Sequence, residues 1–175
     1  MTGKFGEKTN LSDLNLPHLE VILEEAFGLP PSAIFPDFDR PQTIADLARV
    51  TGISHKIVIR RLKEVQHLAT DIEIDCKDLA ALMGSSSPPI LIDVREGWEY
   101  EICHLPGSIL LASASFPDLL PMLVQAARVV AICHHGIRSL SAALYLRKQG
   151  VTGAQSLSGG VGHWAKSIDL SMARY

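Results

Sequence analysis

The feature that most restricts the fold is a short, unbroken apolar run, Val129-Val130-Ala131-Ile132, in the second half of the chain. A run this short fits a strand that is covered on both faces better than a buried helix, because helices are usually longer. Such strands belong to parallel sheets, in which helices connect successive strands and cover the sheet on both sides. The run therefore predicts an α/β domain built around a parallel sheet.

Strand and helix patterns alternate on both sides of this run, which supports that prediction. In chain order we expect a short strand at 72–74, a helix at 77–83, a strand at 89–94, a helix at 116–126, the strand at 129–132, a helix at 138–149, a strand at 154–157 and a helix at 160–166. Loops at the carboxyl ends of parallel strands usually carry the reactive groups of such folds. The residues after 94 and after 132 are therefore the first places to look for a site.

The first 70 residues have a different pattern, which is helical throughout. Apolar spacing predicts helices at 16–27, 43–50 and 54–68, with Gly28 ending the first and a proline-rich connection at 29–41 following it. Residues 1 to about 12 are polar, and we expect them to be frayed. The change of pattern predicts two domains, a small all-α domain at 1–70 and a parallel α/β domain at 71–175.

The second and third predicted helices weakly resemble a helix-turn-helix, with Gly52 in the turn. Four basic residues lie on the third helix: Lys56, Arg60, Arg61 and Lys63. However, residues 1–70 contain eight Lys and Arg against nine Asp and Glu, and they show no wing hairpin. Because a DNA-binding domain is normally strongly basic, we expect this part to pack or to dock a protein partner, with DNA binding as the less favoured alternative.

Charge and cysteine content exclude several classes of protein. The net charge is −3, so no global basic field attracts nucleic acid or anionic lipid. No apolar run approaches the ~18 residues of a membrane helix, and the N-terminus lacks the apolar stretch of a secretory signal. The three cysteines, Cys76, Cys103 and Cys133, are too few and odd in number for a disulfide framework. We therefore expect a cytoplasmic protein with no membrane contact.

Residues 133–139, here named the cysteine loop, lie between the buried strand and the start of the next helix. A thiol at this place is close to backbone N–H groups and to the positive end of a helix dipole, and both stabilise an anion such as a thiolate. Gly136 allows the chain to turn tightly. A lone cysteine at a strand end is more often only a buried hydrophobic residue. The glycine, Arg138 and the helix start favour a nucleophile at Cys133, and the same N–H groups can hold the terminal sulfur of a persulfide once one has formed.

Residues 72–175 resemble a single rhodanese domain, in four segments that follow the family's order. These segments are 91–100, with the sequence Leu-Ile-Asp-Val-Arg-Glu followed by Trp-Glu-Tyr; 104–109, His-Leu-Pro-Gly-Ser-Ile; the cysteine loop; and 157–164, which begins Leu-Ser-Gly-Gly-Val and ends in Trp. The resemblance implies a sulfurtransferase that needs no cofactor. A sulfane donor such as thiosulfate would give its outer sulfur to Cys133, and a thiol, cyanide or a protein would accept it.

The resemblance also implies roles for single residues. Cys133 would be the catalytic residue, Asp93 and Arg95 would support the loop, and Arg138 would help to hold the anionic donor. The residues that would bind the substrate or the persulfide are His134, His135, Gly136, Ile137, Arg138 and Ser139. For Asp93 and Arg95, an ordinary ion pair at a strand end is the alternative. The two histidines have no further ligands at metal spacing, so we expect no metal site.

The length of the loop separates sulfur transfer from phosphate chemistry. Four residues lie between Cys133 and Arg138, whereas rhodanese relatives with phosphatase or arsenate reductase activity have five and therefore a wider cradle. We expect sulfur transfer rather than phosphatase activity. The alternative is a DNA-binding regulator whose rhodanese domain senses reactive sulfur, in which Cys103 would resolve a persulfide into a disulfide. The sequence names neither the physiological donor nor the acceptor.

Overall fold

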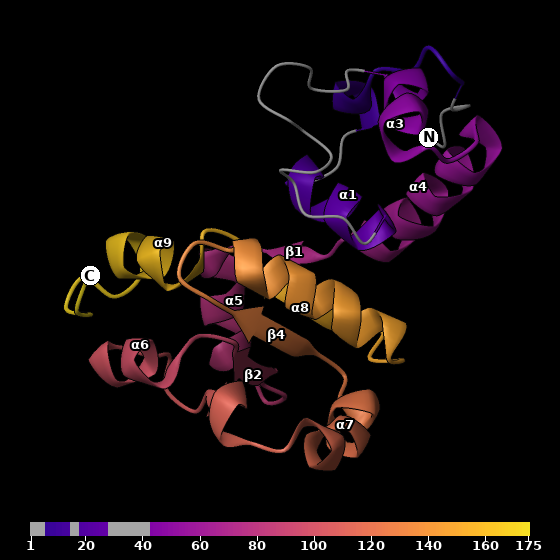
Figure 1. Ribbon diagram of the computed structural model, residues 1–175. Helices are drawn as coiled ribbons and strands as arrows, with labels where there is room; N and C mark the ends of the chain where they lie inside the picture. Colours follow the sequence, from indigo (N-terminus) through magenta and orange to yellow (C-terminus); the bar gives the residue numbers. More distant parts are fainter. Residues whose placement is uncertain (1–5, 15–17, 28–42) are drawn as a thin grey trace. The chain divides into compact units, whose positions relative to one another are not determined.

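A computed structural model describes residues 6–14, 18–27 and 43–175 of the chain. The predicted helix end at Gly28 and the connection at 29–41 lie outside the described residues. Contacts divide the chain into two compact units, Met1–Thr70 and Asp71–Tyr175 (Figure 1).

The unit Asp71–Tyr175 is built on a five-stranded parallel sheet, which confirms the predicted α/β fold. Its strands are β1 (Glu73–Ile74), β2 (Ile90–Asp93), β3 (Ile109–Leu110), β4 (Val129–Ile132) and β5 (Ala154–Leu157). They follow the order β1-β5-β4-β2-β3, and every neighbouring pair is parallel. The apolar run of the sequence is β4, which lies in the middle of the sheet and is buried along its whole length.

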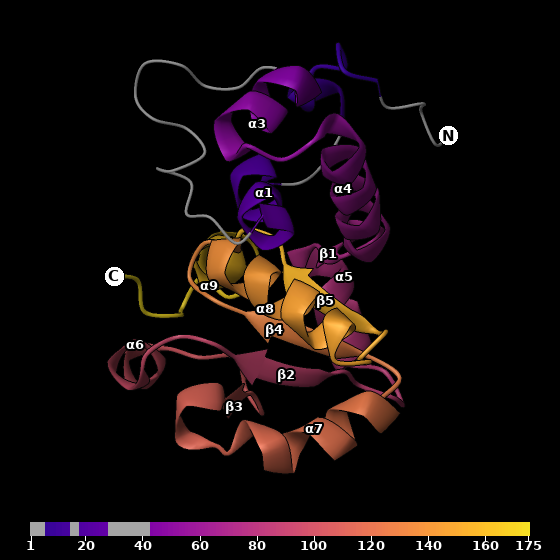
Figure 2. The same cartoon turned by 45° about the vertical axis from the view of Figure 1, so that its right-hand side comes forward.

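Helices cover both faces of this sheet (Figure 2). They are α5 (Cys76–Met83), α6 (Gly97–Ile102), α7 (Phe116–Gln125), α8 (Ile137–Lys148) and α9 (Gly160–Ser167), with a short 3-10 turn at Leu111–Ser113. Successive residues of a strand point to opposite faces. Accordingly Val130 packs with Leu79 of α5 and Trp164 of α9, while Val129 packs with Leu123 of α7 and Leu146 of α8.

Two elements of this unit were not predicted, α6 and β3. Helix α6 has six residues, and it begins with a capping box in which Glu96 and Glu99 each accept the other's backbone N–H. Strand β3 has two residues and pairs with β2 alone. Figure 1 shows α6 at the end of the sheet toward which the arrow of β4 points. The carboxyl ends of all the parallel strands lie at this end of the sheet.

The unit Met1–Thr70 is helical, as predicted. It contains a 3-10 turn at Leu11–Leu14 and the helices α1 (Leu19–Phe27), α3 (Ile44–Thr51) and α4 (His55–Ala69). A capping box at Thr43 starts α3, and Gly52 ends it with a left-handed φ of 67°. The core residues of this unit are Leu11, Leu14, Leu23, Phe27, Ile44, Leu47, Ala48, Val58 and Leu62.

The predicted fraying of residues 1 to about 12 is wrong for the part that the structure describes. The backbone of Thr9 accepts a hydrogen bond from Ile44, that of Glu7 accepts one from Ala45, and Leu11 is buried. The buried Leu11 and the backbone pairing with α3 outweigh the polar composition of this segment. Of the helices that the structure describes, none has the length and apolar character needed to cross a membrane.

Candidate active site

The thiol of Cys133 lies at the start of α8, at the carboxyl end of β4. The residue is 1% exposed. Its Sγ accepts a hydrogen bond from the backbone N–H of Gly136 at 3.1 Å, and the Oγ of Ser139 lies 3.3 Å from it. Gly136 is the N-cap of α8 with φ 93°, a conformation that strongly favours glycine. The strand, the tight turn and the helix dipole therefore hold the sulfur where negative charge is stabilised.

The cysteine loop offers further hydrogen-bond donors to a ligand. Of its backbone N–H groups from His134 to Ser139, only that of Gly136 has a partner within the described part of the chain. The first N–H groups of a helix have no acceptor within that helix, so α8 leaves those of Ile137 to Ser139 unpaired. Unpaired donors next to a sulfur atom form a site for an anion.

Two buried hydroxyls fix the floor of the loop. The Oγ of Ser139 lies 2.8 Å from the Oγ of Ser156 on β5. The hydroxyl of Ser156 also donates to the carbonyl of Gly136 at 3.3 Å. Both serines are fully buried. Sequence reasoning placed Ser139 in the loop but did not find Ser156, which is close only because β5 is the neighbour of β4.

The pair Gly159-Gly160 allows α9 to contact the loop closely. The backbone N–H of Val161 donates to the carbonyl of Cys133 at 2.9 Å, and that of Gly162 donates to the carbonyl of His134 at 3.0 Å. Gly159 and Gly160 have φ values of 71° and 59°. A Cβ atom at Gly160 would overlap with the carbonyls of Cys133 and His134. The glycines are therefore required by the contact between α9 and the loop.

Asp93 and Arg95 form a buried ion pair, with Nη2 of Arg95 2.7 Å from Oδ2 of Asp93. Arg95 also donates to the carbonyl of Cys103 at 2.7 Å and to that of Glu99 at 3.3 Å. Burial alone lowers the pKa of Arg95, but its hydrogen bonds to Asp93 and to the Tyr175 hydroxyl raise that pKa above the usual range. The pair braces α6 and the residues after it. Neither side chain bonds to the cysteine loop in the described residues, so their support of the loop stays a prediction.

Arg138 makes a two-point ion pair with Glu99 of α6. The two N–O distances are 2.7 and 2.6 Å, and the Glu99 side chain is 6% exposed against 47% for Arg138. The hydrogen bonds from Arg138 lower the pKa of Glu99 to about 2, although burial opposes this. Sequence reasoning assigned no role to Glu99. The arginine at the end of the loop is therefore held in place by a carboxylate before any donor arrives.

Tyr175 joins these two ion pairs, and sequence reasoning missed it completely. Its hydroxyl accepts from Nη1 of Arg95 at 2.9 Å and donates to Oε1 of Glu99 at 2.9 Å. Its ring centroid lies 4.5 Å from that of His134. Burial lowers the pKa of His134, and the nearby His135 and Arg95 lower it further. The imidazole of His134 therefore connects the cysteine loop with Tyr175.

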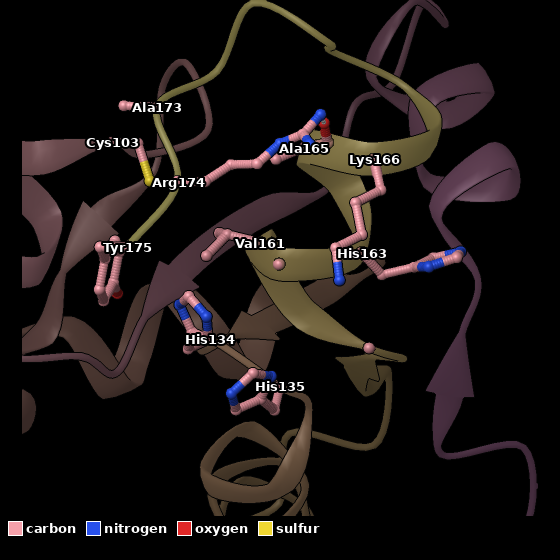
Figure 3. Close-up of a pocket in the computed structure, with 12 residues that line it drawn as sticks. Cys103, His134, His135, Val161, His163, Ala165, Lys166, Ala173, Arg174 and Tyr175 are labelled. Atoms are coloured by element: carbon pink, nitrogen blue, oxygen red, sulfur yellow. Dashed lines mark hydrogen bonds between the residues drawn. The ribbon is translucent and has the colours of Figure 1, made fainter.

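A pocket of about 330 Å³ lies beside the loop (Figure 3) and is here named the loop pocket. Its lining residues are Cys103, His134, His135, Gly159, Val161, Gly162, His163, Ala165, Lys166, Ala173, Arg174 and Tyr175. In Figure 3 the imidazole of His163 lies on the opposite side of α9 from His134. Cys133 and Arg138 are not among the lining residues. The pocket is thus a neighbour of the sulfur site, and His134, which follows Cys133 in the chain, forms part of its wall.

The other residues considered from the sequence differ in their exposure to solvent. His135 and Ile137 are exposed at the rim of the loop, with Ile137 49% exposed. Cys103 lines the loop pocket, whereas Cys76 is buried in the core of the α5 and α9 face, and this burial raises its pKa. The described residues contain no group of three His, Cys, Asp or Glu side chains that could hold a metal ion.

Comparison with known proteins shows the family of the unit that contains this site. The sequence profile of the family described as "Rhodanese-like domain" matches residues 75–167, which is more than half of the chain. The chain is 33% identical to thiosulfate sulfurtransferase GlpE of Pseudomonas fluorescens, over 49% of this chain and 78% of that protein. It is 29% identical to adenylyltransferase and sulfurtransferase MOCS3 of Oryza sativa subsp. japonica, over 62% of this chain and only 27% of that longer protein.

Two solved structures are also similar over part of the chain. SSP1007 from Staphylococcus saprophyticus is 26% identical, with a TM-score of 0.48 over 55% of this chain and 95% of that one. RPA3614 from Rhodopseudomonas palustris, titled a possible tyrosine phosphatase, is 24% identical, with a TM-score of 0.45 over 58% of this chain and 85% of that one.

Proposed function

The chain belongs to the rhodanese-like family, and from this premise we propose that it is a sulfurtransferase that carries sulfane sulfur as a persulfide on Cys133. One observation carries the proposal. The Cys133 sulfur accepts the Gly136 N–H at 3.1 Å inside a loop whose other N–H groups are unpaired in the described residues. These donors suit the outer sulfur atom of a persulfide, which lies one S–S bond beyond the Cys133 sulfur and carries the negative charge.

The proposed reaction has two steps. The Cys133 thiolate attacks the outer sulfur of thiosulfate, the S–S bond of the donor breaks, and sulfite leaves with the electron pair. An acceptor thiolate then attacks the outer sulfur of the persulfide, the new S–S bond forms on the acceptor, and Cys133 leaves as a thiolate. Both steps are exchanges at sulfur, so neither requires a cofactor.

The loop amides, rather than Arg138, are the main donors to the sulfur in this proposal. Glu99 already occupies two N–H groups of Arg138 and neutralises its charge. Arg138 therefore contributes to donor binding chiefly through its fixed position at the end of the loop. His134 and His135 form the wall and the rim that a donor passes.

For the unit 1–70 we propose a separate domain that docks a protein partner. The exposed face of α4 combines Lys56, Arg60 and Lys63 with Ile57, which is 37% exposed. A mixed apolar and charged surface is typical of protein contacts. The ion pair of Arg60 with Glu64 at 3.8 Å reduces the positive field that DNA would require.

Intact-mass spectrometry tests the proposed activity. The wild-type protein is incubated with thiosulfate, and we expect its mass to rise by one sulfur atom and to return after addition of cyanide or a thiol. Cys133→Ser should abolish the gain, because the substitution removes the nucleophile but is nearly isosteric. Cys103→Ser serves as the matched control and should keep the gain.

Sulfur found on Cys103, or turnover that survives Cys133→Ser, would disprove the assignment. Stable modification of Cys133 without release to any acceptor would instead favour the sulfur-sensing alternative.

A further inference from the structure

The loop pocket is lined by two basic side chains, those of Lys166 and Arg174, and by no acidic side chain. Among its lining residues, all of which the structure describes, there is no Asp or Glu. Lys166 is exposed and has no ion-pair partner in the described residues. Arg174 donates one N–H to the carbonyl of Ala165 at 2.7 Å. It forms no ion pair with an Asp or Glu side chain of the described residues. Two cations that pair with no Asp or Glu side chain of the described residues thus border one concave site.

The inner wall of the pocket contains a buried polar atom that has no partner. Nδ1 of His134 is inaccessible to solvent and has no hydrogen-bond partner among the described residues. The rings of His135 and Tyr175 contact the same imidazole. Buried polar atoms in proteins are nearly always satisfied, so this unpartnered nitrogen is an exception beside the pocket.

The size of the pocket limits what enters it. At about 330 Å³ it lies at the lower end of the range for small-molecule sites, roughly 300 to 1,000 Å³. This is ample for an organic molecule of several carbons and too small for a folded protein. His134, which follows Cys133 directly, forms the boundary between the pocket and the sulfur site.

We propose that the loop pocket binds the carboxylates of a small organic thiol, which accepts the sulfur of Cys133. Lys166 and Arg174 attract the carboxylates, and the thiol end of the molecule extends past His134 toward the cysteine loop. This inference rests on the proposed sulfurtransferase activity and specifies its acceptor class. The acceptor thiol loses its proton to water, its thiolate attacks the outer persulfide sulfur, and the protein S–S bond breaks. The products are the organic persulfide and the Cys133 thiolate.

A series of acceptors that differ in charge tests the proposal on the full chain. The acceptors are mercaptosuccinate with two carboxylates, mercaptoacetate with one, neutral 2-mercaptoethanol and cationic cysteamine. KM for each is measured with the wild-type protein and with Lys166→Ala, and the ratio of the two values cancels the intrinsic reactivity of each thiol. Loss of one partly screened cation should raise KM about fivefold for mercaptosuccinate. The rise should be smaller for mercaptoacetate and absent for 2-mercaptoethanol.

Charge reversal and a matched control make the test sharper. Lys166→Glu should increase the effect on mercaptosuccinate and lower KM for cysteamine. Lys77→Ala removes the same charge from an exposed position on α5 outside the pocket, and should leave all ratios near one. KM ratios that are equal across the four thiols would overturn the proposal.

Loading of Cys133 by thiosulfate is followed separately by intact mass in every variant. If wild-type Cys133 gains no sulfur, the sulfurtransferase activity itself is wrong. If it gains sulfur but acceptor charge has no effect, only the pocket assignment is wrong. Efficient transfer to a protein thiol, with no transfer to any of the four small thiols, would also contradict it.

Discussion

Arg138 and Glu99, which are 39 positions apart in the chain, face each other in a two-point hydrogen bond across the rim of the cysteine loop. The carboxylate is almost fully buried and the guanidinium is half exposed. Glu99 also receives the hydroxyl of Tyr175 and caps its own helix. One carboxylate therefore fixes the end of the loop, the start of α6 and the last residue of the chain.

Replacing this carboxylate by an amide should destabilise the domain. We expect Glu99→Gln to lower the free energy of unfolding by about 1–2 kcal/mol, because charge-assisted hydrogen bonds are lost while Arg138 keeps access to water. Urea unfolding at neutral pH measures the change. Glu101→Gln on the exposed side of the same helix is the control, and should alter stability by less than about 0.5 kcal/mol. Equal effects of the two substitutions would contradict the special role of Glu99.

The same carboxylate predicts how stability responds to acid. Its pKa falls from an ordinary value of 4.5 to about 2 in the folded protein. A depressed carboxyl pKa stabilises the folded state above the unfolded pKa, and this contribution disappears as the pH falls toward the folded one. The difference in unfolding free energy between wild type and Glu99→Gln should therefore shrink as the pH falls from about 4.5 to 2. A difference that stays constant over this range would show that Glu99 acts by packing alone.

A methyl group at Gly160 should displace the cysteine loop. The added Cβ would overlap with the carbonyls of Cys133 and His134, and the residue has a left-handed φ. We expect Gly160→Ala to lower the unfolding free energy by about 2–4 kcal/mol and to slow persulfide formation at least tenfold. Gly150 also has a left-handed φ, but a Cβ added there would meet no other atom. Gly150→Ala should therefore lower the unfolding free energy only by the backbone strain, about 1–3 kcal/mol, and leave the rate of persulfide formation unchanged. Normal persulfide formation in Gly160→Ala would show that the contact between α9 and the loop is dispensable.

The loop should not support phosphatase chemistry. Its backbone is confined on the side of β5, since a Cβ at Gly136 would lie 3.0 Å from the nitrogen of Gly159 and 3.2 Å from the carbonyl of Leu157. We expect no hydrolysis of aryl phosphates that depends on Cys133, and we expect insertion of a glycine after Gly136 to weaken sulfur transfer. Release of nitrophenol from its phosphate ester measures the hydrolysis. Activity in the wild type that Cys133→Ser abolishes would refute the size argument.

The helical unit should not bind DNA at physiological salt. Arg61 packs over the ring of Phe27, with its guanidinium carbon 5.8 Å from the centroid, so only three basic residues of α4 lie on its open face. Counterion release at about three phosphates gives too little affinity to survive about 150 mM salt. Fluorescence anisotropy with genomic fragments should show no saturable binding. Sequence-selective binding that Arg60→Ala weakens would reverse this conclusion and favour the regulator.

The parts of the site that lie close together in sequence were predictable. The run 129–132 forms the central strand, and the cysteine loop follows it into α8, because burial, the glycine turn and the helix start all act within a few residues. The glycines at 159 and 160 were recognised only as a family segment. Their physical role became visible when α9 was found against the carbonyls of Cys133 and His134.

The parts that depend on distant pairing were not predictable. Glu99 meets Arg138 across 39 positions, and Tyr175 meets Glu99 across 76. Hydrophobic periodicity does not predict such pairs, because it describes one helix or strand at a time. Helix α6 and strand β3 are too short for a pattern to emerge. Ser156 lies within the short strand pattern of β5, so nothing in the sequence distinguished its hydroxyl from that of an ordinary strand residue.

The position of β5 between β1 and β4 has a consequence for synthesis of the protein. Strands β1, β2, β3 and β4 leave the ribosome before β5, yet β1 has no neighbour in the sheet until residues 154–157 are available. A nascent chain that ends within α8 would already contain Cys133 but would lack Ser156 and the α9 amides that hold its loop. Long-range parallel pairing is slow to form because distant segments must meet first. Cys133 is therefore made early, but the contacts from β5 and α9 that hold its loop form only after residues 154–162 have been made.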